Sequence, residues 1–387
     1  MNILIIKFVY KNLFRFPIRT ILTVLGMTVA ILSFGLLSTV VDAWYAGAEN
    51  ASNARLIVRS STSLIFPLPA TYLQRIKQVP GVKKVSWARW FGGVYKEPKN
   101  FFPQFAIDPQ SYLDVYPEYI VSEEEREIFF GDKRSALIGR KIAEEHDLAM
   151  GDIFQLTGQI FPGQWDFIVA GIYDGATKGT DTAQMFFHWS YLNEEIGKRS
   201  ESRGSEMVGV YIVEVDSRDL TSSVSIAIDE LFSNSSKETY TETEKAFQLG
   251  FVAMTEAIVV AVRLVSYVVI LIIMAVLANT MAMTSRDRVR EYATIRAIGF
   301  QPSFIINLII FESMMLALIG GFIGVLATFP AAIFFRSATG TLFPVFEISI
   351  ETVILQVGFA VLTGVSATII PAIKAASINI TEGLRSF

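Results

Sequence analysis

The sequence predicts an α-helical membrane protein with four transmembrane helices and an α+β extracytoplasmic domain inserted between spans one and two. The composition is too apolar for a soluble globule, with a mean hydropathy of +0.44 and 18% charged residues, against about 25% in ordinary soluble domains. Four apolar stretches are each long enough to cross a bilayer. Residues 42–250, between the first two stretches, carry instead the strand and helix patterns of a folded domain.

The four apolar stretches meet the length requirement of about 20 residues that the hydrocarbon core sets. The first follows basic residues, but it is too long for the apolar region of a signal peptide and no small-x-small site ends it. We therefore predict a retained anchor, with cleavage as the alternative. The predicted boundaries are 20–41 for the first span, 251–285 for a stalk plus the second span, 303–335 for the third and 351–373 for the fourth.

Basic residues beside the spans predict the orientation, because Lys and Arg concentrate on cytoplasmic loops. The N-terminal amphipathic segment 1–19, the connection 286–302 and the tail 374–387 are therefore expected in the cytoplasm. Segment 42–250 and the loop 336–350, which offers only Arg336, are expected outside. The basic residues on the cytoplasmic side are Lys7, Lys11, Arg15, Arg19, Arg286, Arg288, Arg290, Arg296, Lys374 and Arg385.

The domain at 42–250 is predicted from alternating strand patterns and helical patterns between turn signals. A β-rich block of about 110–205 is inserted between the two parts of a βαβ-type unit. The sequence contains no cysteine, so core packing alone must stabilise this domain. The strand-like segments that frame the block are Arg55–Ser60, Val82–Phe91 and Val208–Val215, and the helical ones are Tyr72–Lys77 and Leu220–Phe232.

The second span is predicted to begin well outside the membrane. Thr241 and Glu244 have the Thr-x-x-Glu spacing of a helix start. A continuous helix from there to Ser285 would be roughly twice as long as the hydrocarbon core is thick, so half of it would form a stalk. Two helices broken at Gly250 are the alternative.

A short basic helix is predicted between the second and third spans. Thr284 and Asp287 have the spacing of a capping box, Gly299 suits the residue after the helix, and Pro302 suits the first turn of the next helix. From the residues alone, a helix that binds lipid headgroups is an equally good interpretation.

The sequence resembles the MacB/FtsX/LolC family of permeases along nearly its whole length. The segment RVREYATIRAIG at 288–299 is similar to the family's motif between its second and third spans. The segment LFRFPIRTILTVLG at 13–26 looks like the family's start of span one, and Glu312 with Gly320-Gly321 and Gly324 looks like its third span. The ending PAIKAA at 371–376 with EGLR at 382–385 also matches. Within the α+β segment, IGRKIA at 138–143, MGD at 150–152 and FIVAGI at 167–172 resemble the family's extracytoplasmic module.

The resemblance implies a bacterial inner-membrane subunit, multi-pass and with both termini cytoplasmic, that dimerises and carries an ABC ATPase on its cytoplasmic face. The chain lacks the phosphate-binding loop GxxxxGK[ST]. We therefore expect it to bind no cofactor itself, with ATP and magnesium on a separate ATPase subunit. The second permease copy would be identical or a paralogue. A periplasmic adaptor is a further expected partner. The chain is expected to contact the lipid bilayer and not to bind nucleic acid. The residues expected to couple to the ATPase are Arg286, Arg288, Arg290, Glu291, Arg296 and Gly299.

Glu312 is the single acid within the predicted third span. An acid there costs about 3 kcal/mol unless it is paired, so we expect it to bind a neighbouring helix, with a proton relay as the alternative. Gly320 and Gly324 lie on one face of the third span and Gly364 lies on the fourth, where small residues allow helices to approach closely. Packing within the chain and dimerisation both fit that spacing. The two histidines, His146 and His188, belong to no metal-binding or catalytic motif.

The predicted function is that of a non-catalytic permease subunit. It would couple ATP hydrolysis on a separate subunit to conformational change in the extracytoplasmic domain, and so drive export or extraction of a hydrophobic or amphipathic substrate. One alternative is an FtsX-like regulator of cell-wall hydrolases. Another is a membrane-anchored sensor or enzyme that is not coupled to an ATPase. Reversing Arg288, Arg290 and Arg296 to Glu is expected to abolish ATPase association.

Overall fold

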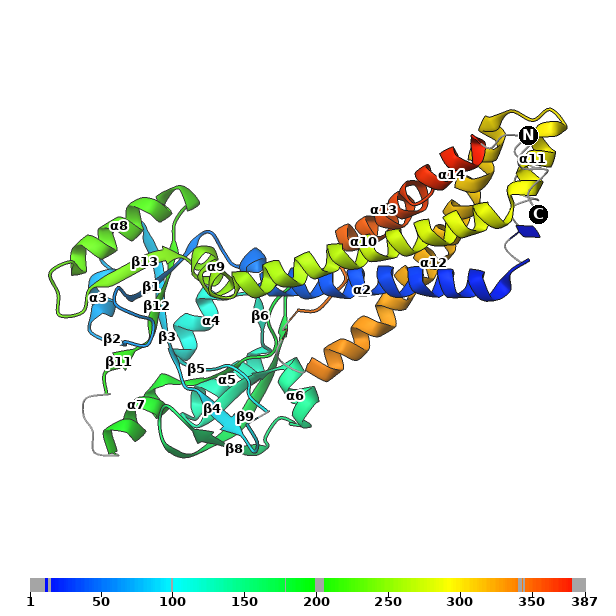
Figure 1. Ribbon diagram of the computed structural model, residues 1–387. Coiled ribbons are helices and arrows are strands. Elements are labelled where there is room, and N and C mark those ends of the chain that lie inside the picture. Colours follow the sequence, from blue (N-terminus) through cyan, green and yellow to red (C-terminus); the bar gives the residue numbers. More distant parts are fainter. Residues whose placement is uncertain are drawn as a thin grey trace. The chain divides into compact units, whose positions relative to one another are not determined.

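The structure is a computed structural model, and it describes residues 11–12, 15–98, 100–177, 179–198, 205–339, 343 and 345–377. Most of the predicted cytoplasmic ends, 1–19 and 374–387, therefore lies outside the described residues. Contacts divide the chain into two compact units (Figure 1). The membrane unit contains Met1–Asp42, Glu256–Ala338 and Phe346–Phe387, and the α+β domain contains Ala43–Thr255 and Thr339–Val345.

The membrane unit is built from long apolar helices. Four helical segments of the described chain are long and apolar enough to cross a bilayer, and the α+β domain follows the first of them, so the predicted fold class is confirmed. The fourth segment is made of two consecutive helices. The helices are α2 (Pro17–Asn50), α10 (Glu256–Asp287), α12 (Pro302–Thr339), α13 (Ile350–Ser366) and α14 (Ile369–Ala376).

The helices of the membrane unit are apolar all round, which is the pattern of membrane spans rather than of surface helices. One side of each helix packs into a shared core that includes Ile31 of α2, Leu277 of α10 and Ile305 of α12. The opposite side still exposes large apolar side chains, such as Phe322 at 66% and Ile354 at 63%. An apolar surface of this extent is expected to contact the hydrocarbon chains of lipids.

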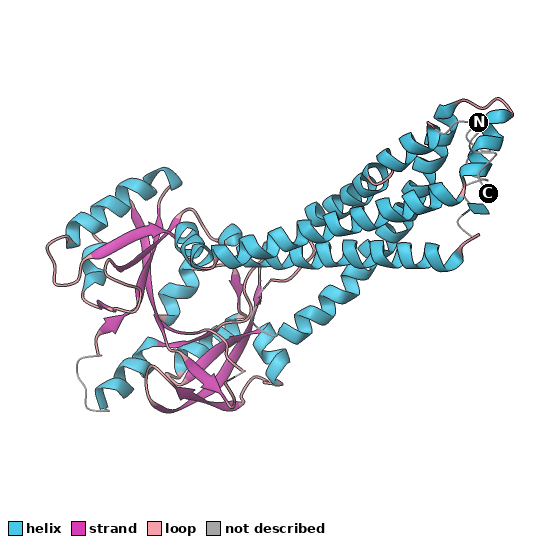
Figure 2. Cartoon of the chain, in the orientation of Figure 1, coloured by secondary structure: helices cyan, strands magenta, loops and turns pink. Residues whose placement is uncertain are grey.

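The α+β domain is organised around a mixed sheet. Among the described residues, eleven strands form this sheet, in the order β13-β1-β12-β3-β5-β10-β7-β9-β8-β4 with β6 beside β9. Figure 2 draws the strands in magenta. Strands β11 and β2 form a separate pair. The strands are β1 (Arg55–Ser60), β2 (Leu68–Pro69), β3 (Val82–Trp90), β4 (Gly93–Tyr95), β5 (Gln104–Ile107), β6 (Tyr119–Ile120), β7 (Ser135–Gly139), β8 (Ile153–Gly158), β9 (Gly163–Gly175), β10 (Met185–His188), β11 (Met207–Val208), β12 (Val210–Val215) and β13 (Thr239–Thr243).

One end of the sheet has a split β-α-β topology, in which β1-α3-β3 and β12-α8-β13 interleave in the order β13-β1-β12-β3. Helices α3 (Tyr72–Ile76) and α8 (Thr221–Phe232) cover it with buried Ile76, Ile228 and Phe232. The chain leaves this split β-α-β part of the sheet after β3 and returns to it at β12. The inserted segment is therefore 91–209, whereas the sequence predicted an insertion of about 110–205. The inserted segment also holds α4 (Pro109–Val115), α5 (Glu123–Gly131), α6 (Arg140–His146) and α7 (Trp189–Lys198).

The continuous helix predicted from Thr241 to Ser285 is wrong in two respects. Thr241 lies in β13, where its backbone N–H donates to Asp229 at 2.9 Å. The helix begins two residues later, and Thr243 caps it by accepting from the N–H of Ala246 at 3.1 Å. The chain then forms α9 (Glu244–Met254) and α10, with the break at Thr255 and not at Gly250.

Candidate functional site

The predicted basic helix between the second and third spans is α11 (Val289–Ala297). Its expected start is wrong, because α10 continues through Thr284 to Asp287 and Arg288 occupies the cap position. Its end is as predicted. Gly299 has a positive φ of 106°; its N–H donates to Arg296 and that of Phe300 to Ile295, the two bonds of a Schellman motif.

Arg288 and Glu312 form a buried ion pair in the membrane unit. Nη1 of Arg288 lies 2.7 Å from Oε2 of Glu312, and the two side chains are 3% and 7% exposed. Nε of Arg288 also lies 3.4 Å from a carboxylate oxygen of Glu291. Glu312 is therefore paired with the residue that leads into α11, and this pair fastens α11 to α12.

Two further ion pairs join the same region to Arg19 of α2 and to Arg15, which lies just before α2. Arg19 donates to Oδ2 of Asp287 and to Oγ1 of Thr284, each at 3.0 Å. Arg15, two residues before the start of α2, pairs with Glu291. Thr284 and Asp287 thus bind α2 instead of capping α11, which is why the predicted helix start fails.

The sequence did not single out these contacts, although it contained a signal for them. Arg15 and Arg19 are four residues apart, and so are Asp287 and Glu291. In the structure neither pair lies within one helix, because Arg15 precedes α2 and Arg288 separates Asp287 of α10 from Glu291 of α11. Matched spacing of opposite charges on two segments is nevertheless a pattern that indicates pairing.

The other residues predicted to couple to the ATPase differ in exposure. Arg286, Arg290 and Gly299 are exposed, whereas Glu291 and Arg296 are partly buried. Arg288 is buried, so it acts inside the membrane unit and presents no surface to a partner. Among the residues predicted to couple to the ATPase, Arg288 is therefore a buried structural residue, and Arg286 and Arg290 are its exposed basic neighbours. Docking of the ATPase on these residues stays a prediction.

The three predicted packing glycines all contact helices of the same chain. A Cβ on Gly320 would lie 2.6 Å from Cβ of Met27, and one on Gly324 would lie 2.9 Å from Cβ of Ile31. Both neighbours belong to α2. A Cβ on Gly364 would lie 3.0 Å from that of Ala317 in α12. These positions therefore bring α2, α12 and α13 together.

Gln356 is a buried polar residue of α13 that sequence analysis missed. Its Nε2 donates to the carbonyl of Ile31 and to Oγ1 of Thr328, each at 2.9 Å. Gly35 makes room for it, because a Cβ there would lie 2.1 Å from this nitrogen. The signal was a lone amide in an uncharged span, where a polar side chain needs a partner.

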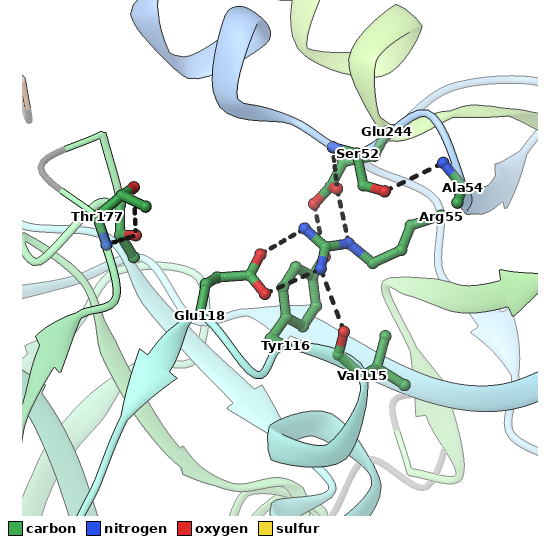
Figure 3. A network of polar contacts seen from close by, with 9 residues as sticks. Ser52, Ala54, Arg55, Val115, Tyr116, Glu118, Thr177 and Glu244 are labelled. Carbon is green, nitrogen blue, oxygen red and sulfur yellow. Dashed lines mark hydrogen bonds and ion pairs between the residues drawn. The ribbon is translucent and has the colours of Figure 1, made fainter.

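The α+β domain contains a second polar cluster, centred on Arg55 (Figure 3). Its guanidinium contacts both carboxylate oxygens of Glu118, at 2.5 and 3.0 Å, and its Nε donates to Glu244 at 2.8 Å. Glu244 also accepts from the hydroxyl of Tyr116 at 2.9 Å. Burial lowers the pKa of Arg55, but the hydrogen bond to Glu118 and the charge of Glu244 outweigh it and raise this pKa above its usual value.

This cluster connects three parts of the domain. Arg55 begins β1, Glu118 precedes β6 in the inserted segment, and Glu244 is the first residue of α9. The same residues line one side of a cavity of about 820 Å³. Among the described residues, no group of His, Asp and Glu could hold a metal ion.

The fold and these clusters define a class, a multi-pass membrane protein whose α+β domain lies between its first two spans. Two family models match the chain: the MacB-like periplasmic core domain over residues 20–231 and the FtsX-like permease C-terminal domain over residues 263–380. The chain belongs to the MacB/FtsX family of ABC transporter permeases, as its sequence motifs predicted.

A relative and two solved structures are similar to this chain. An uncharacterised ABC transporter permease of Methanocaldococcus jannaschii is 24% identical, over 98% of this chain and 97% of the relative. The extracellular domain of the noncanonic ABC-type transporter YknZ, from Gram-positive bacteria, is 16% identical with a TM-score of 0.37, covering 49% of this chain and 98% of that one. A domain of a putative permease from Porphyromonas gingivalis is 14% identical with a TM-score of 0.35, covering 49% and 90%.

Proposed function

We propose that this permease couples ATP hydrolysis on a separate ABC ATPase subunit to movement of its α+β domain. In the proposed arrangement, the ATPase docks on α11 at the cytoplasmic face of a bacterial inner membrane, and a second permease copy completes the complex. The movement exports or extracts a hydrophobic or amphipathic substrate outside the membrane. This chain itself does no chemistry.

The ion pairs around α11 are the observation that carries the proposal. Arg288 ties α11 to α12 through Glu312, and Arg15 and Arg19 tie its start to α2. A buried pair resists separation, because leaving either charge alone costs about 3–5 kcal/mol. A displacement of α11 would therefore be passed to two spans, and α2 continues into the α+β domain.

The test reverses charge on α11 without touching its anchor. Because Arg288 is buried and paired, a triple reversal that includes it would disturb the fold. We expect the double variant Arg290→Glu/Arg296→Glu to lose most of the co-purifying ATPase, roughly tenfold or more if the two positions contribute like typical interface charges. The measurement is ATP hydrolysis by the permease complex purified through a tag on the permease.

The matched control is Lys77→Glu/Arg218→Glu, which makes the same change of charge at two exposed positions of the α+β domain. This variant should retain wild-type ATPase. Undiminished hydrolysis in the α11 variant, with normal membrane insertion, would refute docking on α11.

A further inference from the structure

The cavity of about 820 Å³ is lined by residues of the α+β domain, among them the residues next to the domain boundaries in the sequence. Its lining includes Ala43 of α2, Thr255 between α9 and α10, and Val345 between α12 and α13. Each of these is the residue at which the chain changes units. Three membrane helices are thus covalently continuous with the cavity wall.

Aromatic and flexible apolar side chains form much of the described wall. Trp44 packs edge-on against Phe343, with ring centroids 5.6 Å apart, and its Nε1 donates to Thr255 at 2.7 Å. Phe251 is 43% exposed and Met254 is 83% exposed, although both line the cavity. Aromatic rings and a flexible thioether accept apolar ligands of varied shape.

The charged groups of the described wall are mainly acidic. Glu118, Glu244 and Asp181 line the cavity together with Arg55, whose guanidinium is already bound by both glutamates. Asp181 accepts hydrogen bonds from the N–H of Ala183 and the amide of Gln184, at 2.8 and 2.7 Å, and both donors are neutral.

Asp181 is therefore the carboxylate best placed to receive a cation. Burial raises its pKa, although the hydrogen bonds from Ala183 and Gln184 and the charge of Lys141 oppose this shift. Lys141 itself donates to the carbonyl of Phe343 at 2.9 Å. Lys178 lies outside the described residues.

We propose that this cavity is a binding site for a cationic amphiphile. The apolar body of the ligand contacts Trp44, Phe251 and Phe343, and its positive group lies near Asp181. Carboxylates beside aromatic rings are the chemistry that recognises organic cations. An anionic amphiphile meets the same carboxylates with repulsion.

A ligand in this cavity touches α2, α9, Phe343 and Val345 at once, so it favours one arrangement of these parts over others. That the ligand is a transported substrate rests on the proposed function. Its binding to this cavity does not, and it can be measured on the permease alone.

The test uses rhodamine 6G, an aromatic cation, with the full chain in nanodiscs of zwitterionic lipid. Fluorescence anisotropy reports binding, after subtraction of empty nanodiscs. Gly47 lines the cavity, and the nearest atom to a Cβ there is Oε1 of Gln248, 4.0 Å away. We expect Gly47→Leu to fill the cavity and weaken binding about tenfold or more, without loss of fold, because leucine suits a helix better than glycine does.

The matched control is Gly250→Leu. Gly250 is another exposed helical glycine, it is absent from the cavity lining, and a Cβ there has no heavy atom within 4 Å. This variant should bind as wild type does. Equal affinity in wild type and in folded Gly47→Leu would overturn the cavity assignment.

A second pair of variants tests the charge. Asp181→Asn should weaken rhodamine 6G binding about tenfold, whereas Asp147→Asn, which removes an exposed charge at a left-handed residue that asparagine tolerates, should not. Fluorescein, an anionic dye of similar ring system, should bind wild type at least tenfold more weakly. Equal binding of the two dyes, or no effect of Asp181→Asn, would overturn the cationic class. Loss of ATPase coupling with dye binding intact would instead count against the proposed function alone.

Discussion

At the residue scale, the pair between Arg288 and Glu312 has the clearest consequences. From the sequence alone, Arg288 is expected among the residues that face an ATPase, and Glu312 is a separate acid within a span. The structure joins them at 2.7 Å with almost no exposure. One contact therefore explains why a charge can lie in the third span and why a basic residue begins α11.

Breaking this pair should destabilise the membrane unit. Glu312→Gln and Arg288→Met each leave one buried partner alone, which typically costs about 3–5 kcal/mol. The double variant Arg288→Met/Glu312→Leu removes both charges and should recover most of that loss. Thermal unfolding of the detergent-solubilised chain measures this, with the exposed Arg286→Gln as a near-neutral control. Additive losses in the double variant would show that the two residues do not stabilise each other.

Protonation of His188 should make the stability of the α+β domain depend on pH. Its Nε2 lies 2.6 Å from the carbonyl oxygen of Phe129, and burial lowers its pKa although that hydrogen bond opposes the shift. The unfolded chain, with a histidine pKa of about 6.5, therefore binds a proton more readily than the folded one. Stability is full above this pH and falls as the pH drops through the unfolded value toward the lower folded value.

Hydrogen exchange of β10 measures this dependence. After correction for intrinsic rates, β10 amides should exchange faster at pH 5.5 than at pH 7.5. His188→Gln keeps a donor for Phe129 but cannot be protonated, so most of the difference should vanish. His146, whose pKa burial also lowers, would account for the remainder. An unchanged pH response in His188→Gln would contradict the assignment.

At the element scale, some helix ends are determined by nearby residues and others by contacts with distant parts of the chain. The end of α11 at Gly299 was predictable, because the Schellman motif uses contacts within a few residues. The start of α9 was not, because Thr241 pairs in β13 and is held there by Asp229, which lies in α8. The spacing of Thr241 and Glu244 alone cannot show that a strand competes for the same residues.

The contact between α2 and α12 should be sensitive to a single methyl group. In Gly324→Ala the new Cβ would lie 2.9 Å from both Cβ of Ile31 and the carbonyl oxygen of Thr28. Since backbone must then move, we expect a loss of about 1–3 kcal/mol in the free energy of unfolding. Gly358→Ala, on α13 with no heavy atom within 4 Å, is the control and should be neutral or slightly stabilising. Equal stability of the two variants would argue against close helix packing at Gly324.

At the scale of the whole molecule, orientation in the membrane is the main expectation to test. The chain contains no cysteine, so single cysteines report their side without background. Ser222→Cys, exposed in α8, should react with a membrane-impermeant maleimide in spheroplasts. Gln301→Cys, exposed between α11 and α12, should react only after permeabilisation, because the positive-inside rule places it in the cytoplasm. Labelling of both residues from outside would refute the predicted topology.

The sequence by itself determined the fold class, the four spans and the family. These depend on apolar run length, on flanking charge and on motifs that lie within short segments. It also predicted strands such as β1, whose short run of β-branched and apolar residues is a local signal. Glu312 and the packing glycines were identified as unusual from the sequence, but without their partners.

Only the tertiary structure decided which of these residues meet. Three sets of contacts join residues up to 276 positions apart. They are the pairing of Arg288 with Glu312, the contacts of Arg15 and Arg19 with the start of α11, and the cluster at Arg55. The cavity likewise combines three segments that are remote in the chain. Such contacts depend on helix packing and sheet order, which the pattern of a single segment does not encode.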